Sequence, residues 1–270
     1  MALSKKQTTF EGLKIRYWEG GHGLPVMLLH GSGPGVSTFG NFRLVLEPLA
    51  ERYHLLAFDL IGFGESDRKK APPYFDLELW FRQARAMLQL LPDDNVGVLG
   101  HSISASLALR LAAVESKVAR VLTTGAMGTS FRVNEHTVRT WTFPESREDL
   151  RRAGESLVYD TSIIDDAWIE GRTKILHDGD YGDYFRSMFT GDKQRYVDAA
   201  ALDSSTISKV RCPVLMIHGR DDKPFPFAET TLPLGRALGH ADIVVLSECG
   251  HSPALEQPQK LIHLASMIFG

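Results

Sequence analysis

The sequence has little of several features that would assign it to a specialised class. Only two of its 270 residues are cysteine, and Cys212 and Cys249 lack metal-ligand spacing and are too few for a disulfide framework. No apolar run approaches the roughly 18 residues needed to cross a bilayer, and residues 1–7 lack the apolar core of a secretory signal. No Lys/Arg block stands out and the formal net charge is −3, which argues against nucleic acid and membrane partners.

These absences favour a soluble cytoplasmic protein. The composition is 43% hydrophobic and 23% charged, which is typical of one large globular domain with a full core. No ligand spacing suggests a metal, and no organic cofactor is indicated. The expected partner is therefore a small-molecule substrate.

Apolar, β-branched runs alternate with helical patterns along the chain. Helices are predicted over residues 79–91 and 105–114. Continuous apolar strands that alternate with helices indicate a mainly parallel sheet covered on both faces, and right-handed crossovers make it a doubly wound α/β fold. The predicted strands are residues 13–18, 25–30, 54–59, 96–99, 118–124, 214–218 and 243–246.

One long stretch breaks this alternation. Residues 131–208 contain no convincing buried strand and are charged and aromatic, with helical patterns near 148–159 and 165–176. We interpret them as a helical lid inserted into a core made of residues 1–130 and 209–270. A separate small domain is the alternative, but sheet strands flank the stretch on both sides.

Residues 100–104 (GHSIS) directly follow the apolar run 96–99. A buried strand that ends in Gly-x-Ser and enters a helix makes a sharp turn that exposes the serine hydroxyl at the top of a sheet. Ser102 is therefore predicted to be a nucleophile. The usual last glycine of the motif is Ser104 here, and a strand-to-helix turn that merely contains a serine is the alternative.

A nucleophilic serine needs a base, and the base needs an orienting acid. In this fold class they follow late strands in the order Ser, Asp, His, and the chain supplies Asp222 and His251 at two such positions. The Gly-Arg-x-Asp spacing followed by proline favours Asp222 as the acid, with Asp221 as a solvated neighbour. His218 is expected to be buried and hydrogen-bonded rather than catalytic.

Negative charge that develops on an attacked carbonyl oxygen needs backbone N–H donors. Residues 30–35 (HGSGPG) follow a predicted strand and can present free amides at close range. The expected donors are the N–H groups of Ser32 and of Ile103, the residue after the nucleophile. A phosphate-binding loop is the alternative, but the Lys-Ser/Thr pair and the G-x-G-x-x-G spacing are missing.

At this point the chain resembles the α/β-hydrolases, and more narrowly the meta-cleavage product hydrolases, the C–C bond hydrolases of bacterial aromatic catabolism. The resemblance covers nearly the whole length, and HGxGPG is more specific than the triad. The stretches that carry it are residues 30–37 with Asn41 and Arg43, residues 59–64, residues 159–166 with Arg172, residues 218–222 and residues 249–251.

The resemblance implies a vinylogous 1,5-diketone substrate, cleaved to a carboxylic acid and a 2-hydroxydienoate. It implies that Arg172 contacts the dienoate end, which suits a guanidinium, and that Gly33 and Asn41 contact the substrate. It also implies a homodimer. An exposed helix arginine and a loop-capping asparagine are the alternatives for Arg172 and Asn41.

The chain departs from the family pattern at three places. His101 stands where the family has an asparagine near the substrate, and it is expected to contact the substrate in that place. Ser104 and Ala105 replace two glycines, and Ser252 replaces a tryptophan. Gly-His-Ser is commoner in esterases. A carboxylesterase or lactonase with the same triad is therefore the second hypothesis, and a small-molecule receptor on a hydrolase scaffold is the third.

Overall fold

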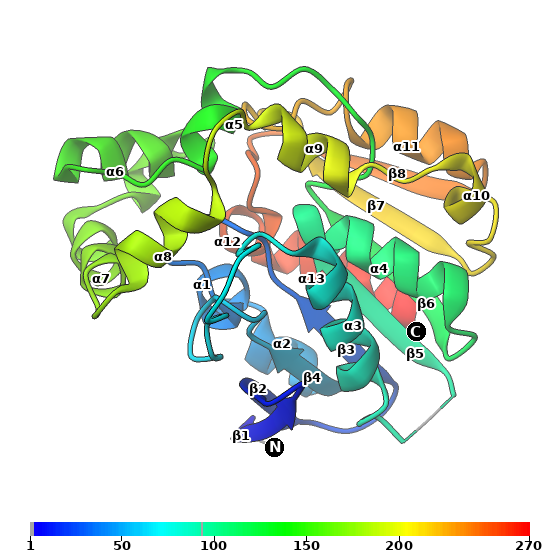
Figure 1. Ribbon diagram of the computed structural model, residues 1–270. Helices are drawn as coiled ribbons and strands as arrows, with labels where there is room; N and C mark the ends of the chain where they lie inside the picture. The colour runs from blue at the N-terminus through cyan, green and yellow to red at the C-terminus, as the bar shows by residue number, and fades with distance from the viewer. Residues whose placement is uncertain (1–2, 93) are drawn as a thin grey trace.

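A computed structural model describes residues 3–92 and 94–270 (Figure 1). Residues 1, 2 and 93 of the predicted core lie outside the described part, and residues 1 and 2 also belong to the N-terminal segment 1–7. The described strands form one eight-stranded sheet in the order β1-β2-β4-β3-β5-β6-β7-β8. The strands are β1 Ser4–Phe10, β2 Leu13–Gly20, β3 Pro25–Leu29, β4 His54–Phe58, β5 Val96–His101, β6 Val118–Thr124, β7 Val214–Gly219 and β8 Ala241–Leu246.

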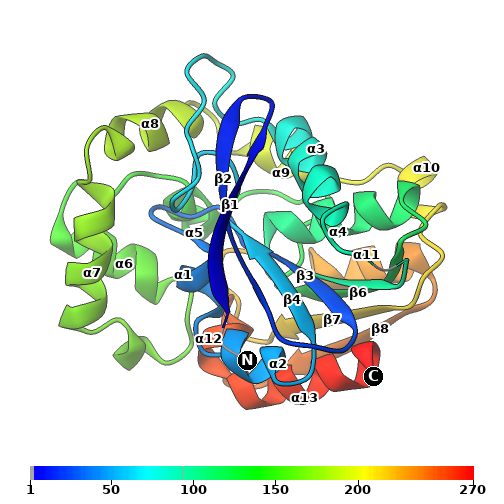
Figure 2. The ribbon, with the colours of Figure 1, turned by 90° about the horizontal axis from the view of Figure 1, so that it is seen from below.

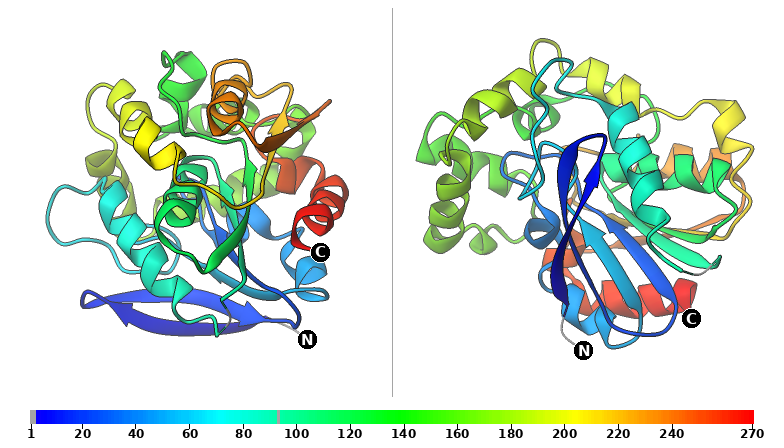
Figure 3. Two further views of the ribbon diagram at one scale, coloured as in Figure 1. Left: turned by 90° about the vertical axis from the view of Figure 1, so that its right-hand side faces the viewer. Right: turned by 60° about the horizontal axis from the view of Figure 1, so that its bottom comes forward.

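The sheet is parallel from β4 to β8, whereas β1 and β2 join it in antiparallel fashion. The β1–β2 hairpin and β8 occupy opposite edges of the sheet (Figure 3). The sequence did not predict β1, because this edge strand is largely exposed and carries no apolar alternation. The expected doubly wound, mostly parallel fold is confirmed.

Each central strand divides its side chains between two apolar layers. On β3, Met27 and Leu29 join one layer, while Val26 and Leu28 join the other, as the two-residue strand period requires. Helices cover both faces (Figure 2): α3 Leu77–Leu88, α4 Ile103–Val114 and α11 Thr231–Leu238 cover the first, and α1 Thr38–Phe42, α2 Leu46–Ala50, α12 Pro253–Glu256 and α13 Pro258–Phe269 cover the second.

The chain between β6 and β7 is helical and contains no strand among its residues, all of which are described. Side-chain caps fix where its helices begin: Asn134 accepts from the N–H groups of the first turn of α5, and Ser146 and Asp165 do the same for α6 and α7. The helices are α5 Glu135–Thr140, α6 Arg147–Glu155, α7 Asp166–Leu176, α8 Tyr181–Met188, α9 Gln194–Ala200 and α10 Ser204–Ile207, with the 3-10 turn Thr161–Ile163 before α7.

This helical segment places α6, α7 and α8 beyond the end of the sheet, on the left in Figure 1. The parallel strands end on that side, and their carboxyl ends are where α/β folds build their sites. The segment therefore faces the loops that follow β3, β5, β7 and β8.

Candidate active site

Ser102 lies at the sharp turn between β5 and α4. Its backbone has φ +59° and ψ −125°, a conformation that a side-chain-bearing residue adopts only at a cost of about 1–3 kcal/mol. A Cβ at Gly100 would lie 2.4 Å from the Ser104 carbonyl oxygen, so the turn requires glycine there. The strained turn aims the serine side chain away from the helix.

Ser104, which replaces the motif's usual glycine, fits without disturbing the turn. The side chain is fully buried, and its hydroxyl donates to the His30 carbonyl oxygen at 2.5 Å. Because His30 follows β3, this hydrogen bond joins the first turn of α4 to the neighbouring strand end. The Ser104 hydroxyl therefore stabilises the packing of α4 against the end of β3, where the usual motif has a glycine.

Ser102, His251 and Asp222 are hydrogen-bonded in a line. The distance from His251 Nε2 to Ser102 Oγ is 2.9 Å, and that from His251 Nδ1 to Asp222 Oδ2 is 2.7 Å. All three residues are at most 5% exposed. A histidine held in this way can take the serine proton while the carboxylate stabilises the resulting imidazolium.

The carboxylate of Asp222 is ionised despite its burial. Burial raises the pKa of Asp222, but the charge of His251, the hydrogen bond from His251 and the polar contact with His218 outweigh it and hold the pKa below its usual range. The second oxygen accepts from the Phe225 N–H at 3.0 Å. Asp221 is partly exposed and lies 3.7 Å from Arg220 Nη2, so it does not share the line.

The two expected N–H donors lie free beside the serine. Within residues 3–92 and 94–270, neither the Ser32 nor the Ile103 N–H donates a hydrogen bond. The neighbouring Gly31 N–H is occupied, because it donates to Asn41 Oδ1 at 2.8 Å. A Cβ at Gly31 would come within 3.1 Å of the Ser102 Cβ, which shows how closely this loop approaches Ser102.

The helical segment holds this loop through side chains of α7 and α8 and of the residue after α5. Trp141 Nε1 donates to Ser32 Oγ at 3.1 Å, Arg172 Nη1 donates to the Pro34 carbonyl oxygen at 2.8 Å, and the Gly35 N–H donates to the Tyr181 hydroxyl at 2.9 Å. Sequence analysis missed the Trp141 and Tyr181 contacts, because pairs 109 and 146 residues apart leave no local signal.

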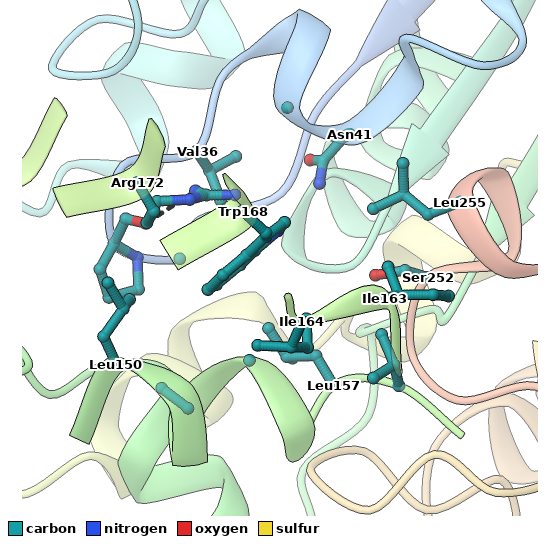
Figure 4. A pocket seen from close by; sticks show the side chains of 16 residues that line it. Val36, Asn41, Leu150, Leu157, Ile163, Ile164, Trp168, Arg172, Ser252 and Leu255 are labelled. Atoms are coloured by element: carbon teal, nitrogen blue, oxygen red, sulfur yellow. Dashed lines mark hydrogen bonds between the residues drawn. The ribbon is translucent and has the colours of Figure 1, made fainter. Parts of the chain in front are cut away.

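An apolar cavity of about 60 Å³ lies between this loop, the helical segment and the chain after His251. Figure 4 shows the side chains that line it, among them the polar groups of Asn41, Arg172 and Ser252. Gly33 also lines it, so three of the four expected substrate-binding residues meet there. Ser102 does not line the cavity, which adjoins the triad through Gly33 and Ser252, the neighbours of Ser32 and His251.

Arg172 enters the cavity from α7 with its charge unpaired. No acidic side chain in the described parts of the chain lies within 4 Å of it, and the guanidinium stacks over the Trp168 ring at 5.1 Å. Burial lowers the pKa of Arg172 to about 10, so it remains a cation at neutral pH. An unpaired guanidinium in an apolar cavity is suited to a carboxylate.

His101, the fourth expected substrate-binding residue, is not among the cavity-lining residues. Its Nδ1 lies 3.0 Å from Thr124 Oγ1 and 3.2 Å from the Thr124 carbonyl oxygen, and its ring centroid is 4.8 Å from that of His251. Burial, together with the charge of His251, lowers the pKa of His101 to about 3. His101 is therefore a neutral group packed against the His251 ring.

Neither a metal centre nor a membrane-spanning helix is found in the part of the chain that the structure describes. The described residues contain no group of three or more His, Cys, Asp or Glu side chains placed to hold a metal ion. Among the same residues, no helix combines the length and the apolar character that a membrane crossing needs.

Comparison with known proteins gives one consistent result. Residues 26–264 match the sequence profile of the alpha/beta hydrolase family. The chain is 32% identical over 256 residues to a 2-hydroxy-6-oxo-2,4-heptadienoate hydrolase of Pseudomonas putida, covering 94% of this chain and 92% of that protein. It is 30% identical over 254 residues to a 2-hydroxymuconate semialdehyde hydrolase of a Pseudomonas species, covering 94% and 89%.

A solved structure gives the same picture. A meta-cleavage product hydrolase from Pseudomonas fluorescens superimposes with a TM-score of 0.91 at 30% identity, covering 97% of this chain and 96% of that one. The similarity therefore extends over the sheet and over the helical segment between β6 and β7.

Proposed function

Since the chain belongs to the α/β hydrolase family, we propose that it is a serine-dependent hydrolase that cleaves a C–C bond of a vinylogous 1,5-diketone, an aromatic meta-fission product. The observation that carries the proposal is the hydrogen-bonded line of Ser102, His251 and Asp222 beside a cavity with an unpaired arginine. The relatives named above act on substrates of this class.

Substrate binding in this proposal uses the polar groups around the cavity. The carboxylate of the dienoate pairs with the Arg172 guanidinium, and the enol oxygen lies near Asn41 and Gly33. His101, packed on the base, borders the reacting end. His251 assists the shift from the enol to the keto form, which places an sp³ carbon next to the carbonyl to be attacked.

Bond cleavage then follows from the geometry of the triad. His251 takes a proton from Ser102, or from a water in its place, and the oxygen attacks the carbonyl carbon. The oxyanion is held by the Ser32 and Ile103 N–H groups, each worth roughly 3 kcal/mol. When the oxyanion collapses, the C–C bond breaks, and its electron pair passes into the conjugated carbonyl, which takes the proton from His251 and leaves as the 2-hydroxydienoate. The acyl part is released as a carboxylic acid, in the serine route after water cleaves the acyl-enzyme.

We also propose that residues 131–208 act as a lid over a core made of residues 1–130 and 209–270. Three contacts from helical-segment side chains to the loop after β3 support this, as does the cavity that lies between them. Substrate entry then requires the helical segment to move, because about 60 Å³ holds only a few water molecules.

The proposal extends to a homodimer in the cytoplasm. Both cysteines are free thiols, which suits a reducing compartment. The edge strand β8 exposes Val245 at 40%, and Met267 on α13 is 68% exposed; a second copy would cover such apolar groups. Light scattering of the purified protein tests the dimer.

The function is tested with two substrates offered to the same preparation, a yellow dienone ring-fission product and a p-nitrophenyl ester. C–C hydrolysis predicts rapid bleaching of the dienone and a feeble ester rate. The reverse result supports an ester or lactone hydrolase, the second candidate, which the Gly-His-Ser turn favours. Ser102→Ala is expected to lower either rate by several orders of magnitude, and a loss of less than about tenfold contradicts the nucleophile assignment.

A further inference from the structure

A second histidine faces the carboxylate that orients His251. His218, the next-to-last residue of β7, is completely buried, and its Nε2 lies 3.2 Å from Asp222 Oδ2. The same nitrogen lies 2.8 Å from the Phe225 carbonyl oxygen, and Nδ1 lies 2.7 Å from Thr231 Oγ1. Sequence analysis expected a buried, hydrogen-bonded His218 but gave it no link to the triad.

These contacts fix which nitrogen of His218 carries a proton. A carbonyl oxygen only accepts, so Nε2 carries the hydrogen and its N–H donates to the Phe225 carbonyl oxygen. The positive end of the same N–H dipole faces Asp222 Oδ2. The Thr231 hydroxyl can then donate to Nδ1. The Phe225 N–H in turn donates to Asp222 Oδ1 at 3.0 Å. His218 thus holds both the carboxylate and the residue that anchors its other oxygen.

The Phe225 ring connects this arrangement to the base. It is completely buried, and its centroid lies 4.5 Å from that of His251. Displacement of the Phe225 backbone would therefore disturb both the carboxylate and the face of the imidazole. We propose that His218 is a positioning residue that orients Asp222 and Phe225 and so sets the basicity of His251. This inference rests on the proposed triad.

The direction of the effect follows from the charges. The His218 N–H draws electron density from Asp222, so its removal leaves more negative charge facing His251 and favours the protonated imidazole. The other titratable groups near the pair are His101 from β5, Asp221 and Cys249 from the adjoining loops, and Glu256 from α12. Burial keeps His101 neutral and Cys249 protonated near neutral pH, and all variants share these groups.

The test measures the rate at which a fluorophosphonate labels Ser102, as a function of pH, because this probe reports serine activation without the natural substrate. In His218→Leu we expect labelling to slow by roughly tenfold or more, and the acid limb of the rate profile to move up by about half a pH unit. His218→Gln, which keeps an N–H donor, is expected to recover most of the rate. Thr231→Val is expected to give a smaller change in the same direction.

Thr137→Val is the matched control. The Thr137 hydroxyl donates to the Pro224 carbonyl oxygen at 2.6 Å, so this variant loses a buried hydrogen bond to the same loop without touching Asp222. We expect a lower Tm and an unmoved acid limb.

Three results would overturn the inference. The first is an acid limb that stays in place or moves to lower pH in folded His218→Leu or Thr231→Val. The second is a His218→Gln variant that labels no faster than His218→Leu, and the third is an acid limb in Thr137→Val that moves as far as in His218→Leu. Failure of the wild type to label overturns the triad as well.

Discussion

Replacement of Arg172 by methionine separates binding from stability. The guanidinium has one backbone acceptor, Pro34, and stacks on Trp168, but it has no acidic partner among the described residues. Methionine keeps the length and the apolar stem while it removes the charge. If the dienoate carboxylate pairs with Arg172, the variant loses charge-assisted hydrogen bonds of about 1.5–3 kcal/mol in total, a loss of roughly ten- to a hundredfold in kcat/KM.

The free energy of unfolding of Arg172→Met is expected to increase slightly or to stay unchanged. Burial lowers the pKa of Arg172 to about 10, so the folded state disfavours the charged form that predominates at neutral pH. Removal of the buried charge eliminates its desolvation cost, which offsets the lost hydrogen bond to Pro34. The free energy of unfolding should therefore stay within about 1 kcal/mol of the wild type.

The assay compares steady-state kinetics on a dienone carboxylate and on its methyl ester, with urea denaturation alongside. The loss should appear with the carboxylate and be small with the methyl ester. Arg186→Met is the matched control, because Arg186 on α8 pairs with Glu145 and stacks on Phe143 away from the cavity. Equal losses on both substrates, or a carboxylate KM and kcat that do not change, would refute the assignment of Arg172 as the anion site.

Three further predictions concern hydrogen bonds around the site. Trp141→Phe removes the donor to Ser32 Oγ at 3.1 Å and should lower kcat about tenfold with little change in KM; an unchanged kcat in steady-state assays contradicts it. Ser104→Gly removes the hydrogen bond to His30 and should cost about 1–2 kcal/mol in urea unfolding, whereas a more stable variant would show that the hydroxyl is dispensable. Burial raises the pKa of Glu256 above 4.5 in the folded protein. The stabilisation linked to protonated Glu256 is therefore complete below the pKa of the unfolded state and is lost as the pH rises through the pKa of the folded state. The urea midpoint of Glu256→Gln should therefore rise relative to that of the wild type between about pH 4 and pH 8. A difference between the two midpoints that does not increase over this range refutes the prediction.

The prediction of the buried strands succeeded because their residues are apolar on both sides. The strands β3 to β7 are mostly buried and rich in apolar residues, a pattern typical of a sheet covered on both faces. The edge strand β1 gave no such signal because most of its side chains are exposed. The helical segment was predicted as a unit, but its individual helices depend on local caps and on packing against distant loops.

The sequence alone determined the doubly wound fold and the order in which Ser102, Asp222 and His251 follow their strands, since both depend on local pattern and on parallel-strand geometry. Only the tertiary structure brought these three into hydrogen-bonding distance. It also placed Trp141 on Ser32 and His218 on Asp222. The physical reason is that such contacts join residues from separate elements, so their distances depend on how the sheet, loops and helical segment pack together.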